Sequence, residues 1–194
     1  MLSRISYPLW KSWDAIFRLV TQMKPLKRGE SHLFFIKKRR YLGPPFSVDG
    51  VNVRPLDPVI ELHMNNRLLA QVVRNQSSLV RTSIKLLKET KRSLPILADR
   101  IGSHAYQRTQ VVYGITLIHR GVERFGFHVF PIDSKTVRTI LTWYLHNIFR
   151  AFNPNANSIL NKRPELFVPK VVVMSKKQLI NSYHRSSGIT SSQK

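Results

Sequence analysis

Apolar side chains recur with helical spacing near the start of the chain, over residues 8–23. They would form one wide face of an amphipathic helix, with the members Leu9, Trp10, Trp13, Ile16, Phe17 and Val20. Two interpretations of this face stay open. It packs on the domain core, because two tryptophans carry a large apolar surface. Alternatively, Trp10, Trp13 and Phe17 anchor the chain in a membrane interface, and Arg18 faces anionic lipid.

The clearest pattern covers residues 78–101 and predicts a helix with two different faces. One face is apolar and is expected to be buried, with the members Val80, Ile84, Leu87, Leu94, Ala98 and Ile101. The opposite face carries a basic stripe, which consists of Arg81, Lys85, Lys88 and Arg92. The stripe is either a solvated face or a surface for an anion. Because Pro95 lacks a backbone donor, we expect a kink there or two abutting helices.

Two further helices are indicated by serines of the kind that cap helix N-termini. Ser134 precedes a helical periodicity that runs to about residue 152. Its apolar members are expected to face inward, and they are Val137, Ile140, Leu141, Tyr144, Leu145 and Ile148. Ser175 precedes a shorter helix that ends near Tyr183. The Asn- and Pro-containing residues 153–164 predict a polar loop between these two helices.

Apolar runs bounded by turn residues predict the strands of a sheet. They lie at residues 32–42, 59–63, 111–118, 127–132 and 168–174. Asp49 and Gly50 are typical of a tight hairpin turn. Strands interspersed with helices predict a single α+β domain over residues 1–184, with roughly five or six strands in the sheet and helices packed on one face. The Ser-rich tail, residues 185–194, is expected to be disordered.

The charge balance indicates what kind of partner this domain has. The chain has 194 residues, and 32 Lys and Arg stand against 10 Asp and Glu, which gives a formal charge of +22. At 42% hydrophobic residues, the composition is that of a folded domain rather than of a basic tail. A surface this cationic predicts an anionic partner. Since no apolar run reaches the roughly 18 residues of a spanning helix, we expect a cytoplasmic protein, or a peripheral one at the inner membrane face.

No sequence motif assigns a reaction. Nucleotide-binding loops, metalloprotease motifs and nucleophile elbows are absent, and so is cysteine. The seven histidines do not have the spacing of metal ligands. Neither a metal nor a cofactor is therefore predicted.

Two strand–helix junctions are candidate anion sites. At the first, His63 ends an apolar strand and Asn65 or Asn66 is placed to cap the next helix, so that backbone N–H groups and the imidazole could meet an anion. At the second, Ser175 precedes Lys176 in the first turn of a helix, where cations are disfavoured unless an anion binds. The alternative for both junctions is a capped turn without a ligand.

Several segments, spread in order over nearly the whole chain, carry a resemblance to a known family. They are WKSWD at residues 10–14, VIELHMNN at 59–66, SLPILA at 93–98, GITL at 114–117, RFGF at 124–127 and MSKKQL at 174–179. These segments resemble the YkoP-like family, small basic domains of Bacillus-type bacteria that occur alone or behind polysaccharide deacetylase domains. The resemblance implies a role near cell-envelope polysaccharide or glycolipid metabolism, and it transfers no catalytic residue. The deacetylase motif itself is absent, so any such chemistry would belong to a partner envelope enzyme.

Three functions stay open at this point. The first is a module that binds acidic lipid, a lipid-linked sugar phosphate or an envelope glycopolymer. The second is nucleic-acid binding, which the basic composition also fits. The third is a transferase or hydrolase that uses His63 as general base. The predicted anion-binding residues are Arg18, His63, Asn65, Arg124, Ser175 and Lys176.

Overall fold

The structure is a computed structural model of the protein. It describes residues 23–27, 29–74, 79–153, 155–162 and 164–184. The membrane-anchor candidates Trp10, Trp13 and Phe17 lie outside the described residues, and so do Arg18 and the tail over 185–194.

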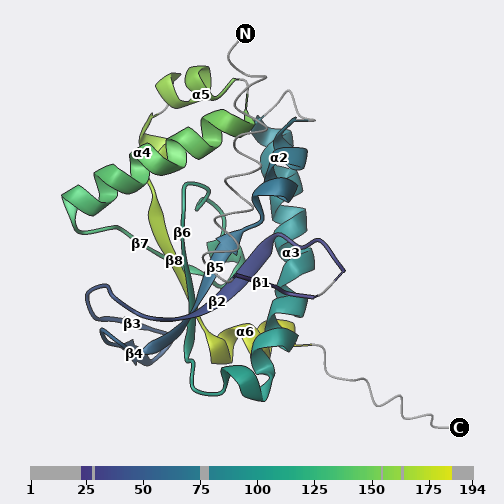
Figure 1. Cartoon of the computed structure of the whole chain (residues 1–194), viewed down its shortest axis with the longest axis vertical. Helices are drawn as coiled ribbons and strands as arrows, with labels where there is room; N and C mark the ends of the chain where they lie inside the picture. The colour runs from purple at the N-terminus through teal and green to yellow at the C-terminus, as the bar shows by residue number, and fades with distance from the viewer. Residues whose placement is uncertain (1–22, 28, 75–78, 154, 163, 185–194) are drawn as a thin grey trace, which may run out of the picture.

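A six-stranded mixed sheet forms the centre of the molecule (Figure 1). In spatial order the strands are β1 (Lys24–Pro25), β2 (Phe34–Arg40), β5 (Pro58–Met64), β6 (Val111–Thr116), β8 (Lys170–Ser175) and β7 (His128–Phe130). Only β5 and β6 pair in parallel among the described strands. A parallel pair requires a long crossover connection, and α2 (Asn66–Arg74) and α3 (Leu79–Gly102) provide it.

The predicted hairpin is confirmed and covers part of one face of this sheet. Strands β3 (Phe46–Val48) and β4 (Val51–Val53) pair directly across the turn. Asp49 and Gly50 both have positive φ, at 49° and 75°, as two-residue turns that match the strand twist require. The hairpin side chains pack with β5, β6 and β8 in a buried cluster, which comprises Tyr41, Val48, Val53, Val59, Val111, Tyr113 and Val173.

Helices α3 and α6 (Lys176–Tyr183) cover the opposite face. The largest buried cluster lies between them and the sheet, and its fully buried members include Ile36, Ile60, Val112, Met174, Leu94, Leu97, Ile101 and Leu179. The α+β class and the expected strands are therefore confirmed. The short helices η1 (His104–Tyr106), η2 (Glu123–Phe125) and η3 (Pro164–Phe167) complete the connections.

The structure corrects the sequence interpretation of α3 in two ways. The helix is continuous with Pro95 inside it, so the alternative of two abutting helices is wrong, and the kink at Pro95 stays a prediction. The buried face is also rotated relative to the predicted one. Leu94, Ala98 and Ile101 are buried as expected, but Ile84 is 48% exposed.

Polar residues explain this rotation, because Thr90 and Ser93 occupy the buried face of α3. The Thr90 hydroxyl donates to the Leu86 carbonyl at 2.9 Å, and the Ser93 hydroxyl accepts from the Leu33 amide at 3.0 Å. A buried polar group that is hydrogen-bonded costs little. An apolar pattern alone could not identify these positions as buried.

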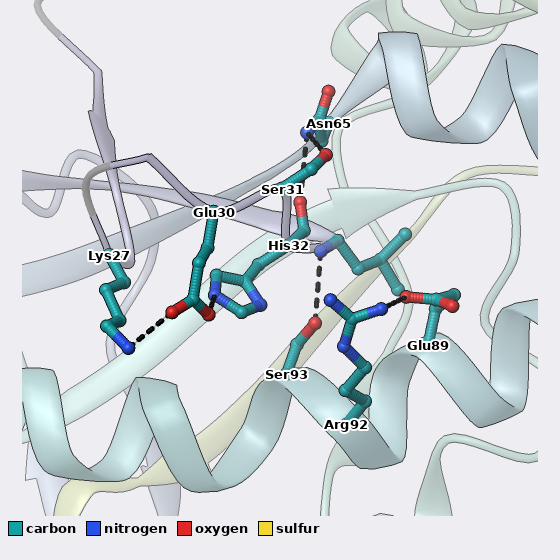
Figure 2. A network of polar contacts seen from close by, with 9 residues as sticks. Lys27, Glu30, Ser31, His32, Asn65, Glu89, Arg92 and Ser93 are labelled. Atoms are coloured by element: carbon teal, nitrogen blue, oxygen red, sulfur yellow. Dashed lines mark hydrogen bonds and ion pairs between the residues drawn. The ribbon is translucent and has the colours of Figure 1, made fainter.

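Polar contacts hold residues 31–33, which precede β2, against the start of α2 and against α3 (Figure 2). Asn65 Nδ2 donates to the carbonyl of the buried His32 at 3.0 Å, and Ser93 of α3 binds the next amide. The Glu30 carboxylate contacts Lys27 and lies 3.1 Å from His32 Nε2. These contacts fix the start of β2 against the crossover helices.

Helices α4 (Lys135–Phe152) and α5 (Ala156–Lys162) lie beyond one end of the sheet (Figure 1). Ser134 caps α4 as predicted, since its hydroxyl accepts from the Val137 amide at 3.3 Å. The polar loop predicted over 153–164 is wrong, because α5 forms there with Ala156 and Leu160 buried. The predicted inward face of α4 is wrong in part. Val137 and Ile140 are 46% and 60% exposed, because the other side of α4, with Leu141, Tyr144, Leu145 and Ile148, faces the cavity at the ends of β5 and β6.

Asp49 connects the hairpin turn to the far strands, and its replacement tests this connection. Its carboxylate accepts from the Ser175 amide at 3.0 Å and lies 2.7 Å from His128 Nε2. Burial acts to raise the pKa of Asp49, but these contacts with Ser175 and His128 outweigh burial and lower it. We expect Asp49→Asn to lower the free energy of unfolding by about 1–2 kcal/mol near neutral pH. Asparagine tolerates the positive φ, so the turn itself is preserved.

The loss of unfolding free energy in Asp49→Asn should be present at neutral pH and absent at low pH. Because the folded-state pKa lies below the ordinary value of about 3.9, the contribution is complete above that pH and disappears as the pH falls through the lowered pKa. Urea unfolding of both proteins at about pH 7 and pH 3 measures this, with Asp133→Asn as the exposed control. An unchanged unfolding midpoint for Asp49→Asn at neutral pH would contradict the assigned role.

Candidate functional site

A charged cluster lies on the sheet, centred on the largely covered side chain of Glu61 of β5. Only 12% of the Glu61 side chain is exposed. Arg39 Nη1 lies 3.2 Å from both carboxylate oxygens, and His63 Nε2 lies 3.3 Å from one of them. Tyr113 of β6 is the register partner of Glu61. Glu61 thus connects a cation of β2 with the histidine that the sequence singled out.

The environment of this cluster sets its charge states. Burial acts to raise the pKa of Glu61, but His63 and Arg39 outweigh burial and lower it. Burial raises the pKa of Tyr113 to about 12, and the neighbouring Glu61 carboxylate contributes to the increase. At neutral pH the carboxylate is therefore ionised and the phenol is neutral. A carboxylate beside an imidazole is one arrangement that orients a histidine for proton transfer, so a base role for His63 stays a prediction.

Two mostly apolar cavities meet at His63. One, of about 210 Å³, lies on the side of α4, and the other, of about 300 Å³, lies on the side of α3. They share lining residues from the ends of β5 and β6 and from α4 and η3, which are Leu62, His63, Met64, Ile115, Thr116, Leu117, Ile118, Phe149 and Phe167. The carboxyl ends of parallel strands are where sheets with crossover helices receive ligands. This end of the sheet is therefore the candidate binding region.

The first predicted anion junction has the geometry of a capped turn. Asn65 Oδ1 accepts from the amides of Arg67 and Leu68 at 3.2 and 3.3 Å, which makes it the N-cap of α2 as predicted. Its amide nitrogen donates to the His32 carbonyl. These bonds occupy both ends of the Asn65 side chain, and a contact of Asn65 with an anion stays a prediction.

At the second junction, a carboxylate of the protein itself accepts a hydrogen bond from Ser175. The Ser175 hydroxyl caps α6 by accepting from the Gln178 amide at 3.1 Å, and the Ser175 amide donates to Asp49. Lys176 Nζ donates to the Tyr106 carbonyl at 2.8 Å, and burial lowers the pKa of Lys176. Both side chains thus hold the fold together, and a ligand role for them stays a prediction.

The described members of the predicted anion site do not form one pocket. Extension of the parallel register from Glu61 and Tyr113 places His63 beside Ile115, whereas Ser175 pairs with Val111. At about 3.3 Å per residue, these positions are roughly 13 Å apart along β6. Arg124 is exposed on η2. The basic stripe of Arg81, Lys85, Lys88 and Arg92 is exposed along α3, as expected for its side of the helix.

Sequence reasoning missed Glu61 and Arg39, although both were visible as charges within predicted strands. It also missed Trp143 on α4, which is 68% exposed. The available signal was its position three residues after Ile140 on the side of α4 away from Leu141 and Leu145. Within the described residues, no three His, Asp or Glu side chains gather in a way that could hold a metal ion. No helix among them is long and apolar enough to cross a membrane.

The fold and site define a small cationic α+β domain with apolar cavities at the end of a parallel strand pair. The model of the YkoP domain family matches residues 3–183, so the chain belongs to this family. The Uncharacterized protein YkoP of Bacillus subtilis (strain 168) is 27% identical over 123 residues, which cover 62% of this chain and 67% of the relative. No solved structure matches the chain. The resemblance inferred from the sequence segments is thereby confirmed.

Replacement of Glu61 by glutamine tests whether the charge of Glu61 stabilises its contacts with Arg39 and His63. We expect Glu61→Gln to lower the free energy of unfolding by about 1–3 kcal/mol at neutral pH, because Arg39 and His63 lose a charged acceptor. Since the pKa of Glu61 is lowered in the fold, the difference from the wild type should be complete above the ordinary glutamate pKa of about 4.3 and should disappear as the pH falls through the lowered pKa.

Urea unfolding as a function of pH measures this difference. Glu165→Gln, on the exposed surface of η3, is the matched control and should leave stability unchanged. Equal stability of Glu61→Gln and the wild type at neutral pH would show that the cluster contributes no net charge interaction.

Proposed function

We propose that this domain binds acidic membrane surfaces, with α4 entering the lipid interface. The observation that supports this proposal best is the outer face of α4. There Ile140 and Trp143 are 60% and 68% exposed, and Thr136 and Asn147 follow the same row of the helix. Tryptophan places an apolar ring and a polar N–H at headgroup depth, so it is the typical residue of such a contact.

Cations accompany this apolar ridge at both ends of α4. Lys135 in the first turn and Arg150 in the last are exposed, and α4 contains no acidic residue. A Lys or Arg near an anionic leaflet contributes about 1 kcal/mol. The basic stripe on α3 and the overall charge of +22 add long-range attraction to the same kind of surface.

The described surface favours lipid over nucleic acid. One common mode of single-stranded RNA recognition, that of RRM domains, uses an open sheet face that carries aromatic side chains. Here α3 and α6 cover one face of the sheet, and the hairpin covers part of the other. The exposed aromatic residue lies instead on a helix beside aliphatic Ile140, which is the arrangement of an interfacial helix.

Co-flotation with vesicles tests this function. We expect the protein to float with vesicles that contain phosphatidylglycerol and not with pure phosphatidylcholine, and to dissociate as salt is raised. Ile140→Ser removes an apolar side chain from the interface and should weaken binding about tenfold or more. Ile84→Ser, which removes an exposed isoleucine from α3, is the matched control and should bind like the wild type.

A gel shift with single-stranded RNA and duplex DNA, at the same ionic strength, provides the comparison. Binding to polynucleotides as tight as to acidic vesicles, or equal loss in both isoleucine variants, would contradict the proposed membrane contact of α4.

A further inference from the structure

The larger cavity, of about 300 Å³, lies between α3 and the sheet and has a mostly apolar lining. Its walls include Leu86 and Leu87 of α3, Met64 of β5, Phe167 of η3 and Val172 of β8. Phe167 stacks on Phe149, with ring centroids 5.5 Å apart, and both rings line the cavity. An apolar cavity of about 150 Å³ suffices to bind benzene. The cavity therefore has room for a segment of a hydrocarbon chain.

Two cations lie at the end of this cavity where β6 finishes. Arg120, from the connection after β6, is one of the lining residues. Lys170 pairs with Thr116, another lining residue, across β6 and β8. Because Lys170 is two residues before Val172 on the same strand, both side chains lie on the face of the sheet that borders the cavity.

His119 precedes Arg120 in the chain and is a further polar group near these cations. Its Nε2 is buried and has no hydrogen-bond partner among the described residues. Burial lowers the pKa of His119, and the positive charges of Lys170 and Arg120 lower it further. Glu123 partly offsets these charges. The rim is thus cationic next to an apolar interior.

We infer that this cavity binds the hydrocarbon chain of a single-chain amphiphile, with its acidic head at Arg120 and Lys170. The apolar walls suit the chain, and the two cations suit a carboxylate or phosphate head. This inference rests on the proposed function, because it identifies a place in the domain for one molecule of an acidic lipid. The inference differs from the proposed function in one respect. The ligand of the cavity leaves the bilayer, whereas the contact of α4 with the membrane does not require any lipid to leave it.

Titration of the full-length protein with free cis-parinaric acid, without vesicles, tests the inference. The fluorescence of this fatty acid rises when its chain leaves water. We expect saturable binding of one acid per protein, and about tenfold weaker binding of the uncharged methyl ester, which lacks the attraction to the rim. Absence of saturable binding by the wild type would overturn the inference.

Leu87→Trp fills the cavity and should weaken the binding of acid and ester at least tenfold. Leu42→Trp makes the same change at an exposed position before the hairpin and should bind like the wild type. Circular dichroism establishes that both variants are folded. If Leu87→Trp is folded and binds the acid like the wild type, the chain does not enter this cavity and the inference is wrong.

A double variant, Arg120→Gln with Lys170→Gln, tests the head position. We expect about tenfold weaker binding of the acid and unchanged binding of the ester. Arg81→Gln with Lys85→Gln removes the same charge from the basic stripe and should leave both ligands unaffected. Equal weakening in the two double variants would assign the effect to net charge and would overturn the assigned rim.

The source of the ligand and the proposed function can be separated in the same experiments. Transfer of the acid from phosphatidylcholine vesicles to the protein supports extraction from a membrane, and binding of the free acid alone supports uptake from solution. Leu87→Trp should still float with acidic vesicles, because α4 is unchanged. Flotation without probe binding refutes the cavity alone, whereas probe binding without flotation refutes the membrane contact alone.

Discussion

The parallel pairing of β5 and β6 is the constraint on which the rest of this structure depends. It requires the crossover through α2 and α3, which places α3 across one face of the sheet. It also brings the carboxyl ends of both strands to the same end of the sheet. The two cavities, His63 and the cationic rim of Arg120 and Lys170 all lie at this end.

Three carboxylates of the chain make internal contacts that hold parts of the fold together. Glu61 joins Arg39 of β2 to His63, Asp49 joins the hairpin to β7 and β8, and Glu30 joins Lys27 to His32. Three of the 10 acidic residues are thereby committed to internal contacts. The exposed cations of α3 and α4 therefore form a surface whose charge the protein itself does little to neutralise, and an acidic lipid surface complements it.

The two proposals concern different parts of the same lipid interaction. The exposed face of α4 is suited to the bilayer interface, since it combines a tryptophan and an isoleucine with flanking cations. The cavity beside α3 is suited to a chain withdrawn from that interface. The cavity and α4 adjoin each other. Phe149 of α4 lines the cavity together with residues from the carboxyl ends of β5 and β6.

The sequence alone determined the features that depend on neighbouring residues: the Asp49–Gly50 turn, the caps Asn65, Ser134 and Ser175, and the strands as apolar runs. Only the tertiary structure decided which side of α3 and α4 is buried. Ser93 of α3 is buried because it binds the Leu33 amide of another segment, and the buried Thr90 binds the Leu86 carbonyl within α3, whereas Ile140 of α4 is 60% exposed. Similarly, α5 depends on the burial of Ala156 and Leu160 by neighbouring elements. The contacts of Glu61 and the position of Lys170 beside Thr116 follow from strand register. Register pairs residues that are distant in the chain, and no local pattern specifies it.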